Sequence, residues 1–256
     1  MSKTMKLNFK KIGEGNPLLI IHGLFGSSDN WGMLGKKFAE KYTVYLIDLR
    51  NHGRSPHSST MNYEAMADDL YELIQDEKIL NPSLIGHSMG GKAALFFNEK
   101  YNSVLHKLIV ADIGIKSYPM HHDVIIRGLK NVNLNVISSR KEAHDALAKY
   151  VTELGIQQFL LKNLYWIEKG KLAWRMNLEV IIDNIHEILT EIKVQDNKTE
   201  TLFLRGELSN YILEEDIDQL KIAMPNSSVK TIKNVGHWLH AENPTEFYEL
   251  TTSFIE

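Results

Sequence analysis

The chain contains no cysteine, and this absence removes several kinds of chemistry. It excludes disulfide bonds, metal sites built on thiolates, and a cysteine nucleophile. It also fits a reducing compartment, so we expect a cytoplasmic protein.

Long apolar runs are lacking as well. The longest aliphatic stretches, such as 17–21 and 108–111, are far shorter than the roughly 20 apolar residues that cross a bilayer. Residues 1–10 are polar and lysine-rich, without the apolar segment of a signal peptide. We therefore expect a soluble protein with no membrane partner.

No block of basic residues is present. The 29 basic and 32 acidic residues are interspersed, and the net charge is −3. A nucleic-acid partner is therefore not expected. We expect a monomer or weak homodimer that acts on a small molecule.

The sequence also offers little to a metal ion. His121, His122 and Asp123 are consecutive, and adjacent residues on a helix point in different directions, whereas chelation favours spacings of three or four. We expect no metal site.

What the chain does contain is an alternation of short apolar runs and longer amphipathic segments, typical of an α/β fold. The strand-like runs are continuous, which favours a mostly parallel sheet buried on both faces. They occupy residues 17–21, 42–49, 83–86, 105–111 and 201–204, with a weaker, edge-like run at 229–233. Helical patterns cover residues 62–78, 89–101 and 244–255.

One stretch breaks this alternation. Residues 113–198 contain no strand-like aliphatic run, only helical patterns and a possible small ribbon at 165–175 with its turn at 169–171. The helical patterns lie at 121–132, 140–154, 156–164 and 178–192. We predict a core made of residues 1–112 and 199–256, and a helical cap insertion at 113–198 that could cover the site.

The candidate nucleophile is Ser88, in the Gly-x-Ser-x-Gly pattern at 86–90. The pattern alone is weak, since it occurs by chance in roughly one chain in ten or fifteen of this size. Here an apolar run enters it and a helical pattern leaves it, as in a strained strand–turn–helix elbow that exposes the serine oxygen. The alternative is a glycine-rich turn with an uninvolved serine.

A serine nucleophile needs a base and an oxyanion hole. His237 follows the last expected strand, where ligands bind at the carboxyl edge of such sheets, and His240 is the competing candidate. The expected oxyanion donors are the backbone N–H groups of Met89 and Leu24, with Phe25 as the alternative to Leu24.

Four segments together resemble a known family. They read HGLFG (22–26), DLRNHGRS (48–55), GHSMGGK (86–92) and GHWLHAE (236–242). They are similar to α/β-hydrolase family carboxylesterases, and more narrowly to the YbfF-type branch, which includes the mitochondrial abhydrolase-domain esterases. The resemblance covers nearly the whole chain and implies the α/β-hydrolase fold.

The acid of the triad departs from the common pattern of this fold. Many members place it shortly after the strand that follows the insertion, where this chain has Ser209, with Glu207, Glu214 and Glu215 offset nearby. Asp112 ends the strand run before the insertion, and it matches the aspartate of the YbfF-type branch. The resemblance therefore implies Asp112 as the acid, with Ser209 as a fourth member of the network.

The remaining motif residues are expected to support the loop or to contact substrate. Asp48, Arg50 and Ser55 are expected to brace the loop beside the nucleophile rather than to act in catalysis. The residues expected to contact substrate are Phe25, His22, His87 and Trp238.

The predicted reaction is hydrolysis of small to medium acyl esters through an acyl-enzyme, without a cofactor. Acyl-CoA thioesters, carbon–carbon hydrolysis and perhydrolysis could use the same groups. Dehalogenase and epoxide hydrolase chemistry is disfavoured, because those relatives need an aspartate at position 88. A slow-turnover ligand receptor is the alternative from another class.

Overall fold

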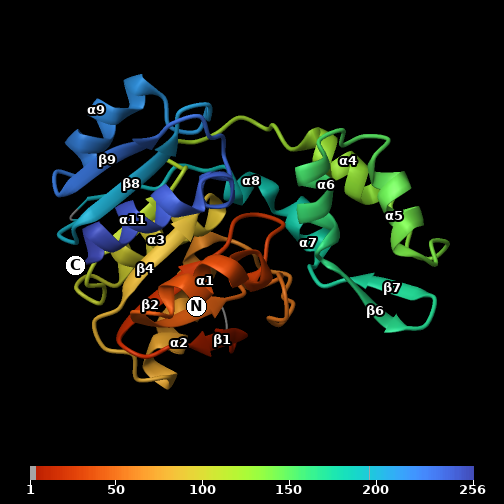
Figure 1. Ribbon diagram of the computed structural model, residues 1–256, viewed down its shortest axis with the longest axis horizontal. Coiled ribbons are helices and arrows are strands. Elements are labelled where there is room, and N and C mark those ends of the chain that lie inside the picture. Colours follow the sequence, from red (N-terminus) through yellow and green to blue (C-terminus); the bar gives the residue numbers. More distant parts are fainter. Residues whose placement is uncertain (1–3, 196) are drawn as a thin grey trace.

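A seven-stranded sheet forms the centre of the protein (Figure 1). The computed structural model describes residues 4–195 and 197–256; residues 1–3, part of the segment searched for a signal peptide, and Asp196, within the predicted insertion, lie outside them. The strand order is β1-β3-β2-β4-β5-β8-β9. The strands are β1 (Phe9–Ile12), β2 (Asn16–Ile21), β3 (Tyr42–Ile47), β4 (Ser83–His87), β5 (Leu108–Ala111), β8 (Thr201–Gly206) and β9 (Ser227–Ile232).

All neighbouring strands pair in parallel except β1, which runs antiparallel to β3 at one edge. The α/β prediction is confirmed, and β9 lies at an edge as expected. Strand β1 was not predicted, because Phe9 and Ile12 flank two lysines and form no continuous apolar run.

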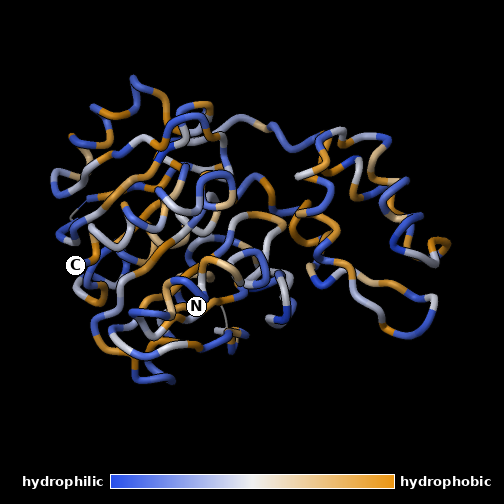
Figure 2. The backbone as a smooth tube through the Cα atoms, in the orientation of Figure 1, coloured by the Kyte–Doolittle hydropathy of each residue, from blue (hydrophilic) through white to orange (hydrophobic). Residues whose placement is uncertain are grey.

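Helices cover both faces of the sheet. Leu18 and Ile20 of β2 pack in one cluster with residues of α1 (Gly32–Phe38) and α11 (Pro244–Ile255), which lie in front of the sheet in Figure 1. Leu19 and Ile21 pack on the other face, against α2 (Tyr63–Asp76) and α3 (Met89–Lys100). This division follows from the alternation of side chains along a strand. Figure 2 shows the hydrophobic stretches that run along the central strands.

Residues between β5 and β8 form the elements to the right of the sheet in Figure 1. They are α4 (Asp123–Asn131), α5 (Arg140–Leu147), α6 (Leu154–Leu161), β6 (Leu164–Glu168), β7 (Lys171–Trp174), α7 (Leu178–Asp183) and α8 (Ile185–Ile188). The predicted ribbon is present as the antiparallel pair β6–β7, and Gly170 in its turn has a positive φ of 80°, which glycine adopts readily.

Several predicted helix bounds were wrong. The segment 140–154 is helical only to Leu147, and 178–192 forms two short helices that meet at Asn184. The Asn184 side chain donates to the Val180 carbonyl, and a side chain that bonds nearby backbone in this way competes with helix continuation.

Among the described residues, three further α-helices and one 3-10 helix were not predicted: α1, α9 (Glu214–Ala223), the short α10 (Leu239–Glu242) and the 3-10 helix η1 (Ser28–Trp31). Helix α9 buries only Asp216 and Leu220, so its apolar stripe is too thin to recognise. Within the described ranges, no helix combines the length and apolar character needed to cross a membrane.

Candidate active site

Ser88 lies at the turn between β4 and α3, with φ 54° and ψ −122°. A positive φ is uncommon for a residue other than glycine and requires support from its surroundings. The flanking glycines permit the tight turn: a Cβ on Gly86 would lie 2.4 Å from the Gly90 carbonyl oxygen, and one on Gly90 would lie 2.5 Å from that of His22.

Three side chains from distant parts of the chain form one hydrogen-bonded series here. His237 Nε2 lies 3.0 Å from Ser88 Oγ, and His237 Nδ1 lies 2.8 Å from Asp112 Oδ2. A carboxylate can only accept, so Nδ1 carries the ring proton and Nε2 is free to accept from the serine hydroxyl. The structure thus brings the three predicted residues together in one hydrogen-bonded series.

Asp112 is fully buried and its carboxylate has three donors. Besides His237, the Gly206 N–H donates to Oδ1 at 3.0 Å, and the Ser209 hydroxyl donates to Oδ2. Ser209 is itself buried, and its oxygen accepts the Tyr211 N–H at 3.3 Å. Ser209, at the position where many members of this fold carry the acid, therefore contacts Asp112.

The alternative acids point elsewhere. Glu207 accepts the Asn234 N–H at 2.9 Å, and Glu214 pairs with Arg205 at 2.7 Å. Both glutamates and Glu215 are exposed, and within the described ranges none of the three makes a hydrogen bond or ion pair with His237.

Leu24, in the loop after β2, lines the same cleft as Ser88. Phe25 N–H donates to His52 Nε2 at 3.3 Å, whereas Leu24 N–H has no protein acceptor among the described residues. Met89 opens α3, so its N–H belongs to the first turn, where the helix supplies no acceptor. Leu24 and Met89 are thus available as donors, and Phe25 is already engaged.

A cleft of about 340 Å³ includes Ser88 in its lining and is also lined by residues of the segment between β5 and β8, the predicted insertion. Of the predicted substrate-contacting residues, Phe25, His87 and Trp238 line it. Its apolar wall from the insertion consists of Ile125, Ile156, Phe159 and Leu160. His22 instead lines an adjoining pocket of about 230 Å³.

His22 and His87 also hold the backbone around the site. His22 is buried; its Nδ1 donates to the Gly23 carbonyl at 2.8 Å and its Nε2 accepts the Leu49 N–H at 3.1 Å. His87 Nε2 donates to the His237 carbonyl at 2.9 Å. Burial lowers the pKa of both rings, so they act as neutral hydrogen-bonding groups.

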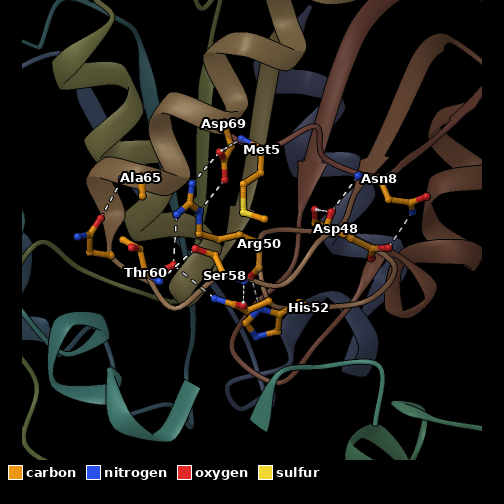
Figure 3. A network of polar contacts seen from close by, with 12 residues as sticks. Met5, Asn8, Asp48, Arg50, His52, Ser58, Thr60, Ala65 and Asp69 are labelled. Atoms are coloured by element: carbon orange, nitrogen blue, oxygen red, sulfur yellow. Dashed lines mark hydrogen bonds and ion pairs between the residues drawn. The ribbon is translucent and has the colours of Figure 1, made fainter. Parts of the chain in front are cut away.

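The segment 48–55 forms the brace that its pattern predicts (Figure 3). Asp48, fully buried, accepts the N–H groups of Ser28 at 2.6 Å and Arg54 at 2.9 Å. Arg50 makes a two-pronged pair with Asp69, at 2.7 and 2.8 Å, with both side chains fully buried. The ion pair joins α2 to the segment 48–55, and it leaves both of its charges paired with each other.

Tyr211 was not predicted as a site residue, yet it contacts His237. Its ring stacks on that of His237, with centroids 3.9 Å apart and an interplanar angle of 17°. Burial raises the pKa of Tyr211 to about 12, so the phenol stays neutral beside the base. Its place two residues after Ser209 was the available signal, but a stacking contact cannot be recognised from spacing alone.

His121 and His122 do not lie on a helix, contrary to the prediction. They precede α4, and their rings lie 4.0 Å apart. They therefore face one another, because helix geometry does not separate them. In the part of the chain that the structure describes, no three His, Asp or Glu side chains are grouped so as to hold a metal ion.

Two buried histidines predict how stability depends on pH. Burial lowers the pKa of His52 and of His240 to about 3 each, from the ordinary 6.5. Between those values the unfolded chain binds protons at both positions and the folded chain does not. The free energy of unfolding should therefore be fully retained above about pH 6.5 and fall as the pH drops toward 3, by up to about 1.4 kcal/mol per pH unit for each histidine.

Urea unfolding at several pH values checks this. His240 stacks on Trp31, with centroids 4.2 Å apart, and its Nδ1 has no hydrogen-bond partner in the described part of the chain. His240→Phe therefore keeps the stack and removes the titrating group. We expect a shallower pH slope for His240→Phe, and an unchanged slope for the control His186→Gln at an exposed position. Equal slopes in His240→Phe and the unaltered protein would contradict the assignment.

Known proteins share both this sequence and this fold. The profile of the alpha/beta hydrolase fold family matches residues 16–136. Esterase YbfF of Escherichia coli is 34% identical over 246 residues, which cover 94% of this chain and 95% of that protein. The mouse sn-1-specific diacylglycerol lipase ABHD11 is 34% identical over 93% of this chain and 80% of its own length.

A solved structure shows the same similarity throughout. That structure, described as a marine microorganism esterase, is 41% identical, covers 98% of this chain and 100% of its own, and superimposes with a TM-score of 0.95. The chain therefore belongs to the α/β-hydrolase family, in the branch of the YbfF-type esterases.

Proposed function

We propose that this protein is a serine carboxylesterase that hydrolyses small to medium acyl esters through an acyl-enzyme on Ser88. The observation that carries the proposal is the hydrogen-bonded series Ser88–His237–Asp112, which opens onto the cleft beside the free Leu24 amide. Relatives named as esterases, including YbfF, support the same activity.

In the acylation step, His237 Nε2 takes the proton of Ser88 as Oγ attacks the ester carbonyl carbon. The carbonyl oxygen gains negative charge and is stabilised by the N–H groups of Leu24 and Met89. Asp112 holds the ring tautomer and stabilises the imidazolium that forms. His237 then gives its proton to the leaving alcohol.

Deacylation repeats the same steps with water as the nucleophile. His237 takes a proton from water, the hydroxide attacks the acyl carbon, and the Ser88 oxygen leaves with the proton returned by His237. Ser209 acts as the proposed fourth member by donating to the Asp112 carboxylate throughout. These steps use only water and groups of the chain.

Residues 113–198 are proposed to form a cap over the cleft. Four of their apolar side chains, Ile125, Ile156, Phe159 and Leu160, line it opposite Ser88. Phe25 and Trp238 complete the apolar wall from the core. We propose that this wall binds the acyl chain, so chain-length preference would be set by the insertion.

A pre-steady-state experiment with p-nitrophenyl esters of increasing acyl length tests the function. We expect a burst of nitrophenolate at most stoichiometric with the enzyme, followed by slower turnover, because acyl-enzyme formation precedes hydrolysis. Mass spectrometry of the quenched protein should locate the acyl group on the peptide that contains Ser88.

Two outcomes separate this proposal from its alternatives. Slow turnover no faster than in Ser88→Ala would indicate a ligand receptor instead of an enzyme. A parallel series of acyl-CoA substrates with higher kcat/KM than the matched oxygen esters would move the proposed activity to thioesters.

A further inference from the structure

Phe25, in the loop that carries the proposed oxyanion donor, has an uncommon backbone conformation. Its φ is +58° and its side chain is 2% exposed. It lies within a tight turn closed by the Gly26 N–H, which donates to the Gly23 carbonyl at 3.0 Å. A positive φ at the third position of such a turn favours glycine, so a phenylalanine there must be held by its surroundings.

Both backbone polar groups of Phe25 are held by side chains. On the core side, its N–H donates to His52 Nε2 at 3.3 Å. The other ring nitrogen of His52 donates to the Arg50 carbonyl at 3.0 Å, which leaves Nε2 as the acceptor. On the opposite side, the Phe25 carbonyl accepts from Asn163 Nδ2 at 2.7 Å.

Asn163 belongs to the insertion, between α6 and β6, and is 3% exposed. Its Nδ2 also donates to the Leu160 carbonyl at 3.1 Å. Two carbonyl oxygens can only accept, so they fix which end of the amide faces them. The backbone carbonyl of Asn163 accepts the Arg175 N–H at 2.8 Å, which ties the residue to the ribbon.

Asn163 thus connects residues 113–198 to the turn that contains Leu24, whose N–H has no acceptor among the described residues. We propose that Asn163 is a positioning residue: by holding the Phe25 carbonyl, it keeps the strained turn in place and so aligns the Leu24 N–H with the developing oxyanion. The proposal rests on the proposed esterase function. Under this proposal, full stabilisation of the transition state requires the contact between Asn163 and Phe25. The insertion would then serve this role in addition to binding the acyl chain.

The chain offers a matched control at another contact between the insertion and the core. Asn177 donates from its backbone N–H to the Asn51 carbonyl at 2.8 Å, and from its side chain to Asn51 Oδ1 at 3.4 Å. Neither residue lines the cleft above Ser88. Asn177→Ala keeps the backbone bond and removes only the side-chain contact to Asn51, which lies outside the turn at 23–26.

The test compares Asn163→Ala with Asn177→Ala on a short p-nitrophenyl ester and on a trifluoromethyl ketone, which forms an oxyanion when Ser88 adds to it. For Asn163→Ala we expect kcat to fall about 10- to 100-fold with little change in KM. The Leu24 N–H would be displaced but still present, so the loss of transition-state stabilisation should be smaller than when an oxyanion donor is deleted. Affinity for the ketone should fall by a similar factor. Asn177→Ala should stay close to the unaltered protein in both.

A second variant separates positioning from general stability. In Asn163→Asp the new carboxylate cannot donate to the Phe25 carbonyl, but its protonated form can. The activity of Asn163→Asp relative to the unaltered protein should therefore rise as the pH is lowered, while the ratio for Asn163→Ala stays flat. Rates are divided by the concentration of sites that react with a fluorophosphonate, so an unfolded fraction does not contribute.

Each failure has its own signature. If the unaltered protein turns over no faster than Ser88→Ala, the esterase function itself is wrong. If it is active but Asn163→Ala matches Asn177→Ala in kcat and ketone affinity, or Asn163→Asp shows no relative gain at lower pH, only the positioning role is overturned.

Discussion

Replacing Ser88 with alanine should lower kcat for a p-nitrophenyl ester by about a million-fold. The loss is this large because Ser88 Oγ is the only nucleophile that His237 Nε2 contacts among the described residues, at 3.0 Å. With the hydroxyl gone, water must attack directly. The residual acceleration over the uncatalysed reaction, about 1000-fold or more, then comes from substrate binding and the oxyanion donors.

Single-turnover kinetics with purified protein measure this loss, since no burst can occur without an acyl-enzyme. Ser253→Ala, at an exposed position on α11, is the control for purification and for traces of host esterases. The expected loss is about a million-fold. A Ser88→Ala variant that kept more than about a hundredth of the activity would therefore show that another group attacks the ester.

Much of the sheet could be predicted because its strands are buried on both faces. Leu18 to Ile21 alternate between two apolar layers, so every position is aliphatic and the run stands out in the sequence. Strand β1 and helix α9 have one thin apolar side each, and neither produced a recognisable pattern. Elements that bury few apolar side chains, such as β1 and α9, are therefore the hardest to predict from the sequence.

At the candidate site, residues close together in the sequence could likewise be predicted, and residues far apart could not. Ser88 and its glycines are local, because the elbow needs them within five residues, and the segment at 22–26 likewise marks its own loop. Contacts such as Asn163 to Phe25, separated by 138 positions, depend on how the insertion sits on the core. No spacing rule relates such residues, so the sequence could not predict the contacts of His52, Asn163 and Tyr211 at the site.

The acid is the second residue whose replacement should have a very large effect. Asp112→Asn is expected to lower kcat by about 10,000-fold while leaving KM nearly unchanged. The change keeps the size of the side chain, so the loss tests the hydrogen-bonding pattern. Three donors converge on the carboxylate: the Gly206 N–H on one oxygen, and His237 Nδ1 and the Ser209 hydroxyl on the other.

An amide cannot accept from all of these donors. If its oxygen stays with the Gly206 N–H, its NH₂ group faces His237 and donates to Nδ1. The ring proton then moves to Nε2, which can no longer accept the proton of Ser88. If the amide turns over, its NH₂ group faces the Gly206 N–H, and leaving that buried donor unsatisfied costs about 1–3 kcal/mol.

The neighbourhood of Asp112 therefore favours the orientation that gives the unproductive tautomer of His237. Steady-state kinetics on Asp112→Asn, with Glu207→Gln and Glu214→Gln as controls, measure the effect. Both control carboxylates are exposed and have other partners, so those variants should retain nearly full kcat. Near-native kcat in Asp112→Asn, together with a loss in either control, would move the acid to the position after β8 and leave Ser209 without its proposed role.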